Sequence, residues 1–139
     1  MRVVNIVDLM ALFAPDLHPH GMPDDRFLEL FTIDREVVFA FHGYPSAAHH
    51  VLHRRPRSDR FHVRGYQEEG TTTPFDMVVR NGVSRYHLCI EAVRRAHRVP
   101  DEAESLEEFC NAQLKRHPAY IRQHLEDMPE IRDWRWSSA

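Results

Sequence analysis

Three stretches of the chain carry apolar positions in the patterns that β-strands show. The first, Met1 to Phe13, is apolar and rich in β-branched residues, and the second, Glu36 to His42, contains five consecutive apolar residues. The third, Phe61 to Arg64, alternates apolar and polar residues. These patterns predict three strands, and the two continuous apolar runs are typical of strands that are covered on both faces.

Apolar positions at helical spacing predict helices between and after these strands. Pro23-Asp24-Asp25 is a typical helix opening, and the apolar face that follows it ends near Thr32. A short helix over Ser46 to His53 is expected after the turn at Gly43-Tyr44-Pro45. Four further helical pieces are predicted at Asp76 to Arg80, from a Ser84 cap to about Arg98, from a capping box at Ser105 to Glu108, and from Pro118 onward.

The order of these elements indicates a fold class. Strands that alternate with helices predict an α/β domain of three layers, with a mainly parallel sheet and helices on both faces. A chain of 139 residues has room for one ordinary domain, so residues 1–139 are expected to form a single domain. The closing segment, which contains Trp134 and Trp136, is expected to dock on the rest of the chain.

Composition excludes several classes of protein. The chain is 42% hydrophobic and 28% charged, which is a globular balance, and its five glycines argue against a glycine-rich nucleotide cradle. A net charge of −3 argues against a general nucleic-acid binder. No apolar run approaches the about 20 residues of a membrane helix, and the first residues lack a signal-peptide pattern. We therefore expect a cytoplasmic protein that binds neither nucleic acid nor membrane.

Eleven histidines in 139 residues raise the question of a metal site. His49 and His53 are four residues apart on a predicted helix, so both could bind one ion, with His42 or His62 as a third ligand. The spacing matches no known zinc motif. Solvated or interface histidines are therefore the favoured interpretation, and no metal ligand is assigned.

Arginine dominates the basic residues, since only Lys115 among the 18 is a lysine. The segment from His53 to Arg64 is densely positive and contains one acid, which suggests an anion clamp. The alternative is a solvated loop whose arginines pair with the acids of the chain. Hydroxyls of the threonine run at 71–73 are possible further donors, or a threonine before Pro74 simply caps the helix that follows.

The sequence offers weak candidates for a nucleophile or an acid–base pair. Cys89 and Cys110 fall on apolar helix faces, where thiols are usually inert core residues. Glu68 and Glu69 are adjacent, but neighbouring loop residues often point apart. No serine has a nucleophile-elbow setting. The residues alone therefore show no complete catalytic constellation, and no catalytic or cofactor-binding residue is assigned.

Several segments together resemble one known family. They are Phe-Ala-Phe-His-Gly-Tyr-Pro at 39–45, the block from His62 to Asn81, Arg85-Tyr-His-Leu, and Pro-Glu-Ile-Arg-Asp-Trp at 129–134. These segments resemble the C-terminal domain of phosphoketolases, and the resemblance runs from about Arg2 to Trp136. The threonine run is one residue shorter than in related sequences, and Ser46-Ala-Ala-His-His replaces a more apolar stretch.

The resemblance implies a part of a larger enzyme. Phosphoketolases use thiamine diphosphate and Mg²⁺ to cleave xylulose 5-phosphate or fructose 6-phosphate with phosphate, giving acetyl phosphate and an aldose phosphate. Their cofactor-binding domains hold the catalytic groups, none of which has a matching position here. The implied role is therefore a transketolase-type α/β domain that serves assembly or regulation, packs on the other domains and takes part in a homodimer.

The resemblance also gives the basic segment a hypothetical role at the entrance for anionic substrates or at a domain interface. The candidate anion or interface residues are His42, Arg54, Arg55, His62, Arg64, Thr71, Thr72 and Thr73. They are dense between two predicted strand ends, where α/β sheets tend to bind ligands. A different interpretation is a stand-alone phosphate- or metal-binding α/β module without catalytic activity.

Overall fold

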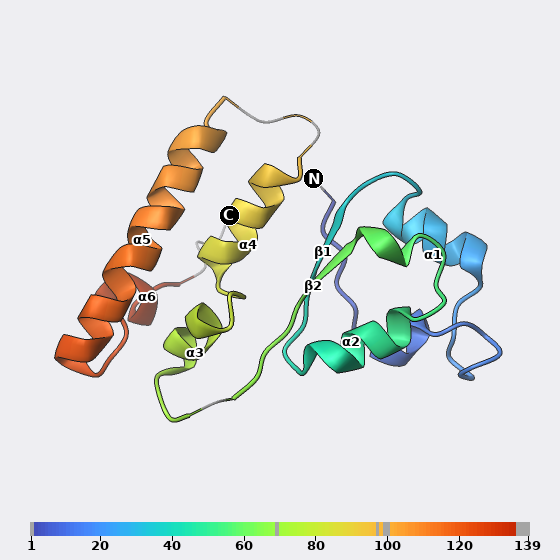
Figure 1. Ribbon diagram of the computed structural model, residues 1–139, viewed down its shortest axis with the longest axis horizontal. Helices are drawn as coiled ribbons and strands as arrows, with labels where there is room; N and C mark the ends of the chain where they lie inside the picture. Colours follow the sequence, from blue (N-terminus) through green and yellow to red (C-terminus); the bar gives the residue numbers. More distant parts are fainter. Residues whose placement is uncertain (1, 69, 97, 99–100, 136–139) are drawn as a thin grey trace. The chain divides into compact units, whose positions relative to one another are not determined.

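The chain divides into two compact units, which we describe separately (Figure 1). The computed structural model describes residues 2–68, 70–96, 98 and 101–135. The N-terminal unit comprises Met1–Gly65 and the C-terminal unit comprises Tyr66–Ala139. Strands occur in the described part of the first unit, whereas the described part of the second is helical.

The N-terminal unit is built around a β–α–β arrangement. Its elements are the 3₁₀ helix η1 (Leu9–Leu12), α1 (Asp24–Phe31), β1 (Val37–Ala40), α2 (Pro45–Leu52), the 3₁₀ helix η2 (Ser58–Arg60) and β2 (Phe61–Arg64). β1 and β2 pair in parallel, with Val37 opposite Phe61 and Ala40 opposite Arg64. Two of the three predicted strands, both short helices and the α/β class are thereby confirmed.

The predicted strand over Met1 to Phe13 is wrong for the described residues. Leu9–Leu12 forms η1, whose start is capped by Asp8, since the Met10 N–H donates to the Asp8 carboxylate at 2.9 Å. Val3 and Val7 are 81% and 92% exposed, so this apolar run is not buried in a sheet of this chain. The sheet of the described residues has two strands, and the three-layer arrangement is not established.

Aromatic rings form the centre of the N-terminal core. The Phe61 ring on β2 lies 5.6 Å from that of Phe27 and 5.0 Å from that of Phe31, both on α1. Leu12 of η1 and Val51 of α2 are buried in the same cluster. Aromatic contacts in the core therefore join α1 to the start of β2.

Helices form the C-terminal unit. They are α3 (Pro74–Arg80), α4 (Arg85–Arg94), α5 (Ala103–His124) and α6 (Pro129–Arg132). Tyr86 and Ile90 of α4 pack against Cys110 of α5. The predicted Ser84 cap is confirmed, because the Ser84 hydroxyl accepts a hydrogen bond from the His87 N–H. α4 ends at Arg94, which is earlier than predicted.

α5 corrects two predictions. The capping box at Ser105 is wrong, since the helix already begins at Ala103 and the Ser105 hydroxyl instead donates to the Glu102 carbonyl at 2.9 Å. Pro118 begins no separate helix but lies inside the continuous α5.

The predicted docking of the closing segment is confirmed in part. The guanidinium of Arg85 lies 5.3 Å from the centroid of the Trp134 ring, although Trp134 remains 45% exposed. Trp136 lies outside the described residues.

Candidate functional site

The carboxyl ends of β1 and β2 bring together two of the candidate residues. The Phe41 N–H donates to the Arg64 carbonyl at 2.9 Å, so the chain is still paired where β2 ends. His42 follows at once and is exposed, whereas Arg64 is half-buried. This edge of a parallel sheet is where ligands of open α/β sheets commonly bind.

A close approach of two loops shapes this edge. A Cβ atom on Gly65 would lie 2.4 Å from the Pro45 side chain, so only glycine fits beside the start of α2. The loop after β2 is therefore held tightly against the first turn of α2. The Gly43-Tyr44-Pro45 turn and Gly65 together position His42 and Arg64 at the same end of the sheet.

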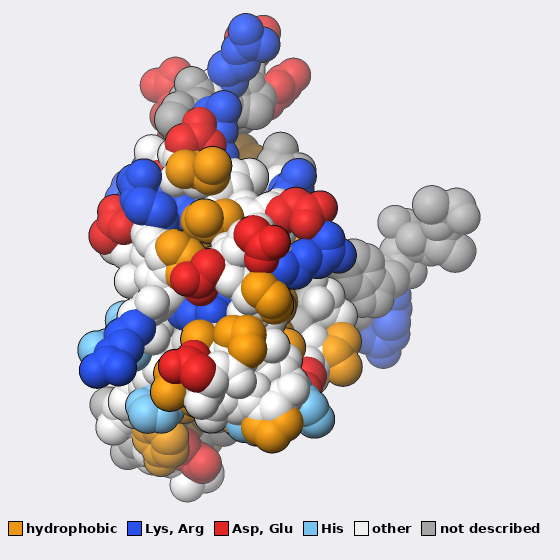
Figure 2. Space-filling model, turned by 90° about the vertical axis from the view of Figure 1, so that its right-hand side faces the viewer, with side chains coloured by type: hydrophobic (Ala, Val, Ile, Leu, Met, Phe, Trp, Pro, Cys, Tyr) orange, Lys and Arg blue, Asp and Glu red, His pale blue; other side chains and the backbone are white. Residues whose placement is uncertain are grey.

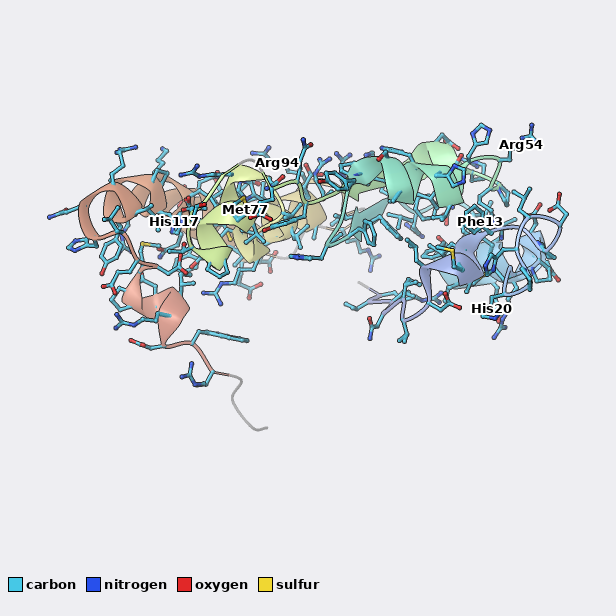
Figure 3. All side chains as sticks on the ribbon, turned by 90° about the horizontal axis from the view of Figure 1, so that it is seen from below. Phe13, His20, Arg54, Met77, Arg94 and His117 are labelled. Atoms are coloured by element: carbon cyan, nitrogen blue, oxygen red, sulfur yellow. The ribbon has the colours of Figure 1, made fainter. Side chains whose placement is uncertain are left out.

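Arg54 and Arg55 lie at the other end of the β–α–β arrangement. A helix that joins two parallel strands runs back against their direction, so the segment after α2 is near the amino ends of the strands. Figure 3 shows Arg54 beyond the end of α2, and its backbone adopts a φ of 64°. The basic segment is therefore divided between both ends of the sheet and forms no single clamp.

Arg55 is part of the fold of the N-terminal unit. Its side chain is buried, its Nη1 lies 3.0 Å from the Asp24 carboxylate, and its guanidinium stacks 4.3 Å from the centroid of the Phe27 ring. Burial lowers the pKa of Arg55, and the negative charges of Asp24 and Asp16 partly oppose that effect. The arrangement ties the loop after α2 to the first turn of α1.

His62 is half-buried on β2 and is paired with a carboxylate. Its Nε2 contacts the Glu36 carboxylate, which lies just before β1. His62 is opposite Val38 in the strand register, and it therefore links the two strands through side chains as well as through backbone. This pairing occupies Nε2 of His62, one of its two ring nitrogens.

The threonine run belongs to the C-terminal unit, where two of its hydroxyls bond to carboxylates. Thr72 donates to Asp76 and Thr73 donates to Asp127, both at 2.6 Å. The Thr73 oxygen also accepts the Asp76 N–H at 3.2 Å, so the alternative that a threonine caps the next helix is confirmed. Thr71 is exposed.

A buried charged cluster was missed by the sequence reasoning. Asp76 is 3% exposed, and its carboxylate lies 2.7 Å from Arg80 Nε and 3.2 Å from Nε2 of the fully buried His117. His117 is labelled in Figure 3 and comes from the middle of α5. The Thr73-Pro-Phe-Asp76 spacing is typical of a helix start, and it could have pointed to Asp76, the residue that α3 contributes to the cluster.

The histidines considered for metal binding are dispersed. His49 and His53 are exposed, and the described residues contain no group of three His, Cys, Asp or Glu side chains placed to hold an ion. His18 stacks on the Phe13 ring at 5.9 Å, and His20 Nδ1 bonds to Asp8 at 2.9 Å. These contacts give part of the histidine excess a structural role.

Charge on the surface is mixed. Figure 2 shows Arg and Lys side chains interspersed with Asp and Glu on the face drawn, with no continuous basic patch among the residues described there. A shallow cavity in the C-terminal unit lies between Gln67, Gly70, Met77, Arg80 and Asn81. The Asn81 amide closes one side of that cavity, because it accepts the Gln67 N–H and donates to the Gln67 carbonyl.

Comparison with known proteins identifies the class of this α/β chain. The XFP C-terminal domain family matches residues 1–136. The chain is 55% identical over 139 residues to a probable phosphoketolase of Rhodopseudomonas palustris (strain HaA2), and the match covers 99% of the chain and 18% of that relative. It is 53% identical over 137 residues to probable phosphoketolase 2 of Rhizobium meliloti (strain 1021), with coverages of 98% and 18%.

These matches define the chain as a member of a domain family found within longer proteins. The chain belongs to the XFP C-terminal domain family, and it corresponds to the C-terminal part, about a fifth of the length, of relatives named phosphoketolase. The resemblance stated from the sequence is thereby confirmed. Separately, none of the described helices is long and apolar enough to span a membrane.

Proposed function

We propose that this chain is the C-terminal domain of a phosphoketolase, a carbon–carbon lyase of carbohydrate metabolism. In this proposal the whole enzyme uses thiamine diphosphate and Mg²⁺ to cleave xylulose 5-phosphate or fructose 6-phosphate with phosphate. The products are acetyl phosphate and an aldose phosphate. The observation that carries the proposal is the match of nearly the entire chain to only 18% of each phosphoketolase relative.

The proposed role of the domain is assembly and regulation rather than chemistry. Residues 1–139 act as one transketolase-type domain in the cytoplasm, which packs on the cofactor-binding domains of the same enzyme and contributes to a homodimer. The contacts of Arg55, Thr72 and Thr73 give these candidate residues a part in the fold of their own units rather than in chemistry. In this proposal the isolated domain is not catalytic.

The carboxyl edge of the sheet is the surface that we propose faces the substrate entrance or a neighbouring domain. His42 and Arg64 lie together there, and a cationic rim would attract sugar phosphate and inorganic phosphate. Arg54, at the opposite end of the sheet, would then serve a separate interface. Arg55 contributes only through the fold of the N-terminal unit, as Thr72 and Thr73 do in the C-terminal unit.

A domain exchange tests the proposed function. The corresponding C-terminal segment of the Rhodopseudomonas palustris relative is replaced by this chain, and acetyl phosphate formation is measured with both sugar phosphates, thiamine diphosphate and Mg²⁺. We expect the exchanged enzyme to be active and dimeric and the enzyme without the segment to be inactive or misassembled. An inactive exchanged enzyme that still assembles would contradict the proposal.

Single variants in the exchanged enzyme test the surface. Arg64→Ala is expected to raise the KM for phosphate or sugar phosphate, or to weaken the dimer, whereas Arg57→Ala, an exposed residue in the loop before η2, is the control. Equal behaviour of the two variants would refute the role of the carboxyl edge. Calorimetric titration of the 139-residue chain with phosphate and Zn²⁺ tests the stand-alone module, which requires binding by the isolated chain.

A further inference from the structure

The two cysteines of the chain meet between α4 and α5. Cys110 is on α5 and is 2% exposed, while Cys89 is on α4 and is half-buried. Both belong to the apolar cluster around Tyr86 and Ile90. The sequence predicted inert core thiols on apolar helix faces, and the structure places both in one apolar cluster.

The Cys89 thiol affects the protonation of Cys110. Burial raises the pKa of Cys110 to about 11, and the contact with Cys89 and the negative charge of Glu107 act in the same direction. Both thiols lie in the same apolar cluster between α4 and α5, where Cys89 packs against the buried residues that include Cys110. Cys110 is buried, so Cys89 is the thiol with appreciable access to solvent.

We propose that Cys89 and Cys110 form a reversible disulfide bond between α4 and α5, with a peroxide as the oxidant. Cys89 is the residue that the oxidant reaches, and Cys110 is the resolving thiol. The two residues are on separate helices that pack against each other, so the bond would close the chain segment between them into a loop. Such a bond fixes the α4–α5 packing against opening.

The reaction balances with hydrogen peroxide. The thiolate of Cys89 attacks one oxygen, the O–O bond breaks, and the departing hydroxide takes up the proton that Cys89 released, which leaves water and a sulfenic acid. The Cys110 sulfur then attacks the Cys89 sulfur and displaces hydroxide, which leaves with the Cys110 proton as a second water. Two thiols are oxidised to one disulfide, and one peroxide is reduced to two waters.

The sequence allows the bond to be mapped directly. The protein is purified in the form in which its host makes it, treated with hydrogen peroxide, alkylated and digested with trypsin without reduction. Cleavage at arginine and lysine places Cys89 in the peptide 86–94 and Cys110 in the peptide 99–115. We expect the two peptides to be recovered as one disulfide-linked species, 2 Da lighter than their sum, which dithiothreitol separates.

Two matched variants distinguish this bond from other oxidation. In Cys110→Ser, which lacks the resolving thiol, we expect Cys89 to stop at oxygenated forms or mixed disulfides. In Cys89→Ser, we expect Cys110 to remain unmodified at a peroxide dose that fully links the parent protein. Two unlinked peptides, a link between two copies of the chain, or oxygenated Cys89 as the main product of the parent protein would each overturn the proposal.

Discussion

The Asp76 carboxylate lies 3.2 Å from Nε2 of His117, a side chain with no solvent exposure. Asp76 also accepts from Thr72 and pairs with Arg80, so one carboxylate links the threonine loop, α3 and α5. The Phe75 ring lies 5.5 Å from the imidazole and covers another side of it. The pair is thus the polar tie between α3 and the long helix of the C-terminal unit.

Removal of that carboxylate is expected to be costly. Asp76→Ala leaves Thr72 without its acceptor and removes the carboxylate that faces the buried His117 imidazole, and we expect a loss of about 2–4 kcal/mol in the free energy of unfolding. Denaturation by urea measures the effect. Asp133→Ala is the control, since Asp133 pairs with Arg132 at the surface, where the loss of an ion pair costs little stability. Equal losses for the two variants would contradict the structural role of Asp76.

Local patterns predicted the β–α–β arrangement because its elements carry their signals close together. The apolar run before His42 and the alternation after Phe61 appear as β1 and β2, and the Asp24-Asp25 opening appears as the first turn of α1. The strand predicted over Met1 to Phe13 is wrong because an apolar, β-branched run does not show whether a partner strand exists for it. Val3 and Val7 remain exposed in this chain.

The candidate site could not be assembled from spacing along the chain. His42 and Arg64 are far apart in sequence, yet both lie where the two parallel strands end. Arg54 lies between them in sequence, but α2 carries it to the other end of the sheet. The partners Asp76 and His117 are on different helices, so no local pattern joins them. Such relationships depend on topology and packing, which a single sequence does not display.

Arg60 completes the end of α1, and its loss should destabilise the N-terminal unit. The buried guanidinium donates to the carbonyls of Thr32, at 2.8 Å, and Arg35. Arg60→Met would leave those acceptors without a partner at a helix end, at a cost of about 2–3 kcal/mol. Thermal or urea unfolding checks this value. Arg57→Met, which removes a half-exposed cation paired with Asp59 at 3.4 Å, should change stability by less than about 1 kcal/mol.

Pro118 is a site where a substitution should stabilise the protein. It lies inside α5, is exposed, and has no N–H to donate to the carbonyl of Leu114 one turn earlier. We expect Pro118→Ala to raise the free energy of unfolding by about 1–3 kcal/mol. Pro129→Ala is the contrasting variant, because Pro129 is at the first position of α6, where proline suits a helix. A Pro118→Ala protein no more stable than the parent would show that the packing of α5 compensates for the missing bond.

The pairing of Asp8 with His20 predicts an acid-dependent loss of stability in the N-terminal unit. The hydrogen bond from His20 is the main cause that lowers the pKa of Asp8 below 3.8, and the Met10 N–H acts in the same direction. Because the pKa is lower in the folded protein than in the unfolded chain, this contribution is present above about pH 4 and is lost as the pH falls through the folded value. The expected window of loss is therefore below pH 4.

Titration of the Asp8 carboxyl carbon by NMR measures that pKa directly. In His20→Ala we expect the midpoint to rise toward 3.8 but to remain below it, because the Met10 N–H still donates to Asp8 at the start of η1. His49→Ala serves as the control, since His49 is an exposed histidine of α2 with no place in this pair, and it should leave the midpoint unchanged. A midpoint in His20→Ala equal to that of the parent would mean that the cap of η1, and not the histidine, sets the charge state of Asp8.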